Sequence, residues 1–156
     1  MPNDEALRNH VIDLLKSGHA HADLESVIKG WKPELRGTRV AGFNHTAWQL
    51  LEHLRIAQWD MLGFSKSADH VSPTYPDGYW PDGGAPPDEA AWDGSVAQFV
   101  RDQGEMQRLV LDTSIDLFER IPHGDGQTVL KEALTLADHN AYHIGQLMVL
   151  RKHLDV

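Results

Sequence analysis

The chain of 156 residues contains no cysteine. This absence excludes disulfide frameworks, thiolate metal sites and cysteine nucleophiles, and it agrees with the cytoplasmic location that we expect. No block of lysine and arginine stands out and the formal net charge is −9, so we expect no nucleic-acid binding. No apolar run approaches the roughly 20 residues that span a bilayer, so we expect no membrane association either.

Alternating β-branched stretches bounded by hairpin turns are also missing, so we expect no strand. Helical periodicity instead predicts an all-α protein with four helices, at about residues 4–17, 45–64, 95–119 and 129–153. Asn44 and Thr128 are the expected N-caps of the second and fourth helices, and Gly94 is expected to interrupt the pattern before the third. The length suits one domain, which we place over residues 1–156.

A long connection rich in proline and glycine joins the second and third predicted helices. Between residues 72 and 92 it carries five prolines together with Tyr75, Tyr79, Trp80 and Trp92. Solvated linkers rarely hold so many aromatic residues, which favours an ordered strap. A four-helix bundle with a long crossover has such a connection. We expect the strap to wall a cavity between the helices; in the alternative it packs outside the bundle and only links two helices.

Ten histidines are the unusual feature of the composition. His139 and His143 lie along one edge of the apolar stripe of the last predicted helix, so both imidazoles lean toward the core, one turn apart. Two nitrogens at this spacing can reach one metal ion, as they do in helical zinc sites. The alternative is a pair of half-buried histidines that bond to neighbouring groups.

A third ligand can come from the second predicted helix. His53 lies at the edge of its apolar stripe, whereas His45 lies in the first turn, nearer the polar side. His53 is therefore the better candidate, and a satisfied core histidine is again the alternative. We expect four other histidines on the surface: His10, His70, His123 and His153.

Other polar residues could support such a site. Glu52 and Glu132 could orient an imidazole, and Asp60 lies two turns along from His53 on nearly the same face. A solvated helix surface is the commoner position for each carboxylate. Asn140 lies in mid-stripe between the two histidines of the last helix, where it could line a cavity. None of these residues is assigned a catalytic role.

The stretch HTAWQLLEHLRIAQWDMLGF, followed far downstream by DHNAYHIGQLMVLRKHL, resembles the DinB-like superfamily. The intervening segments YWPDGGAPPDEAAW and IPHGDGQTVLKEALTLADH look like one branch of it, and the resemblance spans about Gly42 to Leu154. It implies a four-helix bundle with a long crossover between helices two and three, often a homodimer. It also implies a divalent metal bound by His53, His139 and His143, and none of these positions departs from the pattern.

Three imidazoles leave at least one metal position open, which is the layout of a catalytic site rather than of a closed structural one. Relatives resemble hydrolases or transferases that act on low-molecular-weight thiols. The resemblance therefore implies a metal-dependent hydrolase or thiol transferase with a small-molecule substrate. The alternative is a non-catalytic, stress-related bundle in which the metal staples two helices. Imidazole ligands suit zinc and nickel, which are the expected metals.

Overall fold

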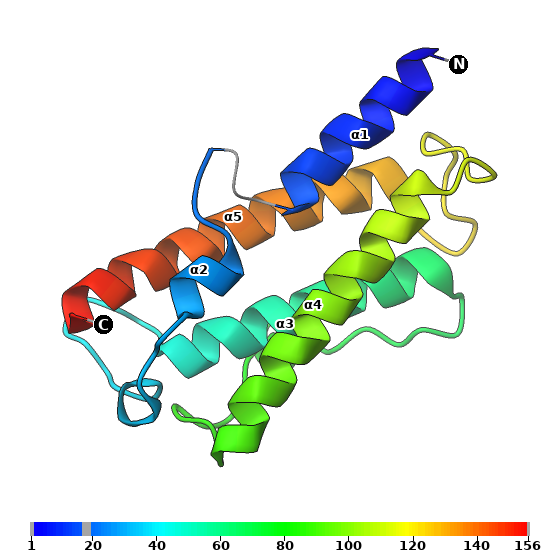
Figure 1. Cartoon of the computed structure of the whole chain (residues 1–156). Helices are drawn as coiled ribbons and strands as arrows, with labels where there is room; N and C mark the ends of the chain where they lie inside the picture. The colour runs from blue at the N-terminus through cyan, green and yellow to red at the C-terminus, as the bar shows by residue number, and fades with distance from the viewer. Residues whose placement is uncertain (1, 17–19, 156) are drawn as a thin grey trace.

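The computed structural model is all-α, as predicted, and it describes residues 2–16 and 20–155 (Figure 1). The four long helices are α1 (Pro2–Lys16), α3 (Ala47–Lys66), α4 (Glu89–Leu111) and α5 (Val129–Leu154). The short ones are α2 (Leu24–Ile28) and two 3-10 helices, η1 (Pro33–Leu35) and η2 (Asp77–Tyr79). The predicted end of the first helix, at residue 17, lies outside the described residues. None of the described helices has the length and apolar character needed to span a membrane.

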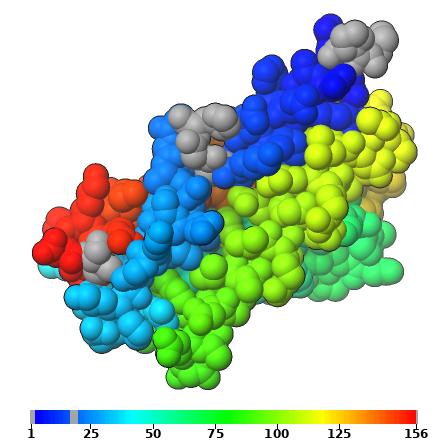
Figure 2. Space-filling model, viewed as in Figure 1, coloured from blue at the N-terminus to red at the C-terminus, as the bar shows by residue number. Residues whose placement is uncertain are grey.

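The long helices pack as a bundle in which α3 contacts α4 and α5, and α1 contacts the same two helices. In Figure 1, α1 and α5 run in one general direction, and α3 and α4 run in the other. Because α3 and α4 point the same way, the connection between them, residues 67–88, has to return along the bundle. On the face seen in the space-filling view, side chains of α1 and α2 lie against those of α4 (Figure 2).

Two clusters of buried apolar side chains fill the bundle, together with a layer of buried amide side chains. In this layer Asn140 Nδ2 donates to Gln58 Oε1 (3.0 Å), and Gln58 Nε2 donates to the carbonyl of Phe99 (2.6 Å). Both amides are almost fully buried, and they link α3, α4 and α5. Asn140 is therefore part of the core rather than the lining of an open cavity. Representative members of the two clusters are Leu51, Leu54, Leu147 and Leu150 in one, and Val11, Met106, Leu117 and Leu136 in the other.

The start of α3 differs from the prediction, because its N-cap is Thr46 rather than Asn44. The Thr46 hydroxyl accepts the Gln49 backbone N–H (3.2 Å), and the Gln49 side chain accepts the Thr46 backbone N–H (3.1 Å). This reciprocal capping box satisfies two backbone donors, which a lone Asn44 cap would not do. The start of α5 is as predicted, with Thr128 as its N-cap.

The bounds of α4 also differ from the prediction. The helix begins at Glu89, where the Asp88 side chain accepts the backbone N–H of Ala91 (2.7 Å). It then continues through Gly94, because one glycine inside a helix costs only about 1 kcal/mol relative to alanine and its neighbours can offset that. It ends at Leu111, well before the predicted end near residue 119.

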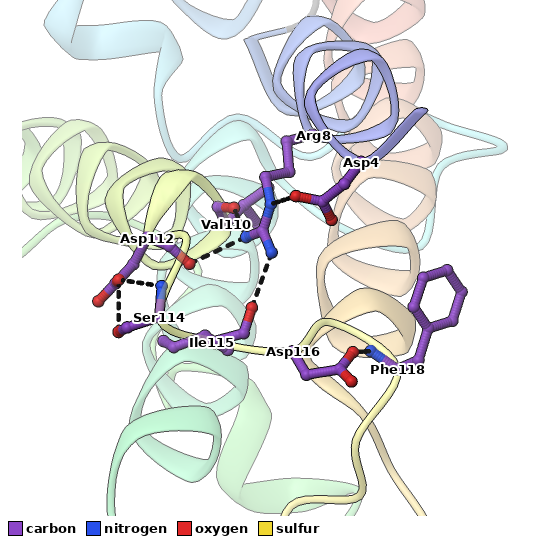
Figure 3. Close-up of polar contacts among 8 residues, drawn as sticks. All are labelled: Asp4, Arg8, Val110, Asp112, Ser114, Ile115, Asp116 and Phe118. Atoms are coloured by element: carbon purple, nitrogen blue, oxygen red, sulfur yellow. Dashed lines mark hydrogen bonds and ion pairs between the residues drawn. The ribbon is translucent and has the colours of Figure 1, made fainter. Parts of the chain in front are cut away.

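Arg8 of α1 holds the end of α4 in place (Figure 3). Its buried guanidinium donates to the backbone carbonyls of Val110 (2.6 Å), Asp112 (3.0 Å) and Ile115 (2.7 Å). Its Nε donates to the carboxylate of Asp4 (2.9 Å). Carbonyls at the end of a helix have no intrahelical donor, so Arg8 supplies one from another helix.

Replacing Arg8 by methionine is therefore expected to lower the free energy of unfolding by about 3 kcal/mol, because buried carbonyls lose a charged donor. Arg101→Met is a matched control, since Arg101 is exposed and donates to Gln98 on its own helix (2.6 Å). The control is expected to lose less than about 0.5 kcal/mol. Urea titrations of both variants measure the difference, and equal losses would contradict this role of Arg8.

Candidate metal centre

Three histidine side chains from two helices converge inside the bundle. His53 comes from the middle of α3, and His139 and His143 come from successive turns of α5. The Nε2 atom of His53 lies 3.1 Å from Nε2 of His143 and 3.0 Å from Nε2 of His139. All three rings offer one nitrogen within 4.8 Å of the others, a group that could hold a metal ion. The structure thus brings together the three histidines that the sequence singled out.

The outer nitrogens of two of these rings face oxygen acceptors. His53 Nδ1 lies 2.9 Å from the backbone carbonyl oxygen of Tyr79, and His143 Nδ1 lies 2.7 Å from Oε1 of Gln146. A carbonyl oxygen only accepts, so each Nδ1 carries the proton and each Nε2 presents a lone pair. Two lone pairs that face each other at 3.1 Å repel unless a cation attracts both. This arrangement fits a divalent metal held by imidazole nitrogens.

Burial keeps these imidazoles neutral. The pKa of His139 and that of His143 fall to about 4, first because burial disfavours the charged ring. The neighbouring rings add to the effect, since each would repel a second positive charge. Burial also lowers the pKa of His53, although its hydrogen bond to the Tyr79 carbonyl opposes the shift. Metals bind the neutral form of imidazole, so at neutral pH the folded chain presents its ligands in the required state.

The connection between α3 and α4 lies directly against the cluster. The Trp80 ring stacks on His53, with ring centroids 3.9 Å apart and planes 1° apart. His45 stacks on Trp80 at the same centroid distance, 3.9 Å, with planes 11° apart, so the indole is held between two imidazoles. The strap therefore forms a wall of the site, rather than packing outside the bundle and only linking two helices. His45, the weaker third candidate, lies beyond Trp80 rather than among the converging nitrogens.

Asp60 fastens this strap to α3. Its Oδ2 accepts the hydroxyl of Tyr79 (2.5 Å), and its Oδ1 lies 2.8 Å from Nε2 of His70. Burial and the Asp60 carboxylate together raise the pKa of Tyr79, so its hydroxyl keeps its proton. The surface positions expected for Asp60 and His70 are wrong, because the strap folds against α3 and its His70 packs on Asp60. Tyr79 therefore contacts Asp60 through its hydroxyl and the outer nitrogen of His53 through its backbone carbonyl.

The other two candidate carboxylates are Glu52 and Glu132. Within the described residues, neither of them forms a hydrogen bond with a histidine ring. Glu52 is buried rather than solvated, and it accepts hydrogen bonds from Arg55 (2.8 Å) and from the Ser95 hydroxyl. Burial alone would raise the pKa of Glu52, but these hydrogen bonds outweigh it and lower the pKa. Glu132 is half-buried, and burial raises its pKa.

An open groove of about 730 Å³ reaches the cluster. His143 belongs to its lining, so the groove and the histidine cluster share a wall. The pKa of His45 at the groove is lowered, first by burial and then by the charge of Arg39. The segment before α3, the strap and the outer side of α5 supply the other walls: Phe43, Asn44, Trp80, Tyr142, Gly145 and Gln146.

The fold and the site together define an all-α bundle in which the second and the last long helices bring three histidines together beside an open groove. The sequence matches the family model of the DinB superfamily over residues 18–147, more than half of the chain. The chain therefore belongs to the DinB superfamily, and the resemblance noted in the sequence is confirmed. No curated protein and no solved structure matched the chain.

Proposed function

We propose that this chain holds a divalent metal ion, zinc or nickel, with His53, His139 and His143, and that it catalyses a metal-dependent reaction of a small molecule. The observation that carries the proposal is that His143 belongs both to the three-nitrogen cluster and to the lining of the groove. When bound, a divalent cation supplies Lewis acidity, which lowers the pKa of a water or thiol that reaches it. A bundle in which the metal only staples α3 to α5 is the non-catalytic alternative, and it gives no reason for the groove.

The chain's own residues prepare the ligands. The Tyr79 carbonyl and the Gln146 side chain keep the protons of His53 and His143 on Nδ1, which leaves each Nε2 free to bind. Trp80 covers one face of His53 and limits the access of water from that side. These contacts fix the direction of the ligands before any metal arrives, which is a feature of effective metal sites.

Of the two reactions, the positions of the carboxylates favour thiol transfer, in which the sulfur of a small thiol displaces a leaving group from an electrophile. Metal-dependent hydrolases commonly use a nearby carboxylate as the base for water. Here Glu52 is engaged by Arg55 and Ser95, and Asp60 is engaged by the strap. A thiol loses its proton near pKa 8.5 and bulk water near about 15.7, so a thiol needs less help from a base. Hydrolysis is the second candidate, because an open metal position also suits water.

Metal analysis followed by paired assays tests the proposal. Protein purified without a nickel column is expected to carry a divalent ion, which mass spectrometry can identify. A thiol such as cysteine with 1-chloro-2,4-dinitrobenzene tests thiol transfer, and 4-nitrophenyl acetate tests hydrolysis. We expect the thiol reaction to slow at least about tenfold after treatment with a chelator and to recover with zinc. Bound metal with neither activity would support the staple instead.

The resemblance also implies a homodimer, and the absence of cysteine agrees with a cytoplasmic location. We propose both for this chain. Light scattering on a size-exclusion column measures the mass of the assembly, and a mass equal to that of one chain would contradict the dimer.

A further inference from the structure

The groove beside the histidine cluster has a neutral lining. The chain carries 14 basic and 23 acidic residues, yet none of the described residues that line the groove is Lys, Arg, Asp or Glu. Its polar side-chain groups are uncharged amide, imidazole, hydroxyl and indole groups, from Asn44, Gln146, His45, His143, Tyr142 and Trp80. A charged ligand group placed here would lose water and find no counter-charge among the lining side chains, which is unfavourable. Arg39, whose charge acts on His45, is not one of these lining residues.

The aromatic side chains of the groove differ in what they offer to a ligand. Trp80 has an imidazole stacked on each face, so only its edge is open. Tyr142 is 64 % exposed, and its ring stands nearly perpendicular to that of His143, with centroids 4.8 Å apart. Tyr142 therefore presents an aromatic face next to one of the proposed metal ligands, where a planar apolar group can stack.

Gly145 leaves space on the same side of the groove. It lies in α5, two residues after His143, and a Cβ atom added there would meet no other atom within 4 Å. The backbone is helical at this position, so a side chain of any size is compatible with it. A side chain at position 145 would therefore begin in open space beside the groove, whose lining includes Gly145.

We infer that the groove binds the uncharged aromatic part of an electrophilic substrate, with Tyr142 as its stacking face and Gly145 as its open space. The role of this group in a reaction rests on the proposed function, but its binding does not, because the lining carries no charged side chain of its own when no metal is bound. The inference specifies one of the two substrates of thiol transfer and excludes electrophiles whose aromatic part is charged.

Three probes with one ring system test the inference: 2-naphthamide, 2-naphthoate and 2-naphthylmethylammonium. Each is titrated into the full-length ¹⁵N-labelled chain, first with a chelator, so that no cation attracts the carboxylate, and then with zinc. With the chelator, naphthamide is expected to bind at least about tenfold more tightly than either charged probe. Its largest amide shifts are expected at Gly145, Gln146 and Val149, which line the groove.

Two leucine variants supply the matched comparison. Gly145→Leu is expected to weaken naphthamide binding at least about tenfold and to leave zinc stoichiometry unchanged. Gly94→Leu makes the same change in α4, at an exposed helical glycine that also has no atom within 4 Å of an added Cβ, and it is expected to bind as the wild type does. The smaller Gly145→Ala change, which favours the helix, gives an intermediate loss and serves if the leucine variant does not fold.

Equal or tighter binding of a charged probe would overturn the inference, as would wild-type binding by Gly145→Leu. If zinc fails to bind but naphthamide still shifts the groove amides, the proposed function fails and the inference stands. Zinc binding and thiol transfer without any naphthamide binding would overturn the inference alone.

Discussion

Replacing His139 by alanine is expected to weaken zinc binding at neutral pH by at least about a hundredfold, since even the partners of metal ligands commonly contribute tenfold or more. The change leaves two imidazoles for the ion. His53 Nε2 keeps His143 Nε2 at 3.1 Å but loses its neighbour at 3.0 Å, His139 Nε2. His139 is the most informative of the three, because the Tyr79 carbonyl and Gln146 contact the other two rings and would lose their partners. Competition with a chromophoric chelator measures the affinity.

His10→Ala is the matched control for this prediction. His10 is exposed on α1, so the variant loses the same side chain far from the cluster along the chain, and its zinc affinity is expected to stay within about twofold. Circular dichroism shows whether both variants keep the helical fold. Wild-type zinc affinity in a folded His139→Ala protein would show that the ion uses other residues.

Replacing Asp60 by asparagine is expected to weaken zinc binding by about tenfold to a hundredfold, although Asp60 contacts no proposed ligand. Its two oxygens accept from Tyr79 and face the ring nitrogen of His70, whereas an amide offers one acceptor oxygen. A contact between Asp60 and the strap is lost, and the Tyr79 carbonyl is then held less firmly at 2.9 Å from Nδ1 of His53. The His53 ring then gains freedom to rotate and to exchange its proton between nitrogens. The ¹⁵N shifts of this ring report that change without any metal.

Glu52→Gln separates this effect from a general loss of stability. Glu52 precedes His53 on the same helix and is as buried as Asp60, each being 8 % exposed, but its partners are Arg55 and Ser95. The variant is expected to be less stable than the wild type and to keep zinc affinity within about threefold. Tyr79→Phe, which removes the hydroxyl but keeps the carbonyl, is expected to reproduce part of the Asp60→Asn loss. Equal losses of affinity in Asp60→Asn and Glu52→Gln would contradict the positioning role.

The three converging histidines could be predicted because helical periodicity alone decides which side chains share a face. His139 and His143 lie one turn apart whatever the tertiary structure, and the stripe of α3 points His53 toward the same interior. The family resemblance pointed to the same residues. The all-α class followed in the same way, from patterns that act over one or two helical turns.

The support of the site could not be predicted, because it depends on the path of the strap. Nothing local to Asp60 or His70 indicates burial. Asp60 is covered because Tyr79 and His70 of the connection reach it, and His70 packs against Trp59 and Asp60 of α3. Tyr79 and Trp80 carried a signal, since aromatic residues in a proline-rich connection need apolar surroundings. That signal predicts an ordered strap, but it does not say that Trp80 stacks on His53.

The start of α3 and the bounds of α4 were missed for a related reason. The sequence before α3 offers Asn44 and Thr46 as caps, and the reciprocal bond with Gln49 decides for Thr46. The start of α4 is set by Asp88, and the helix continues through Gly94 because its flanking turns are packed. Each outcome depends on a balance of about 1 kcal/mol, which composition alone does not resolve.

X-ray absorption spectroscopy of the zinc-loaded protein tests the central claim most directly, since it counts the imidazoles around the ion. The expected spectrum has three imidazole nitrogens at about 2.0–2.1 Å and at least one further light ligand from solvent in the open position. In His139→Ala the imidazole count is expected to fall, or the zinc to be lost. A wild-type spectrum with fewer than three imidazoles, or one that His139→Ala leaves unchanged, would contradict a metal centre built from His53, His139 and His143.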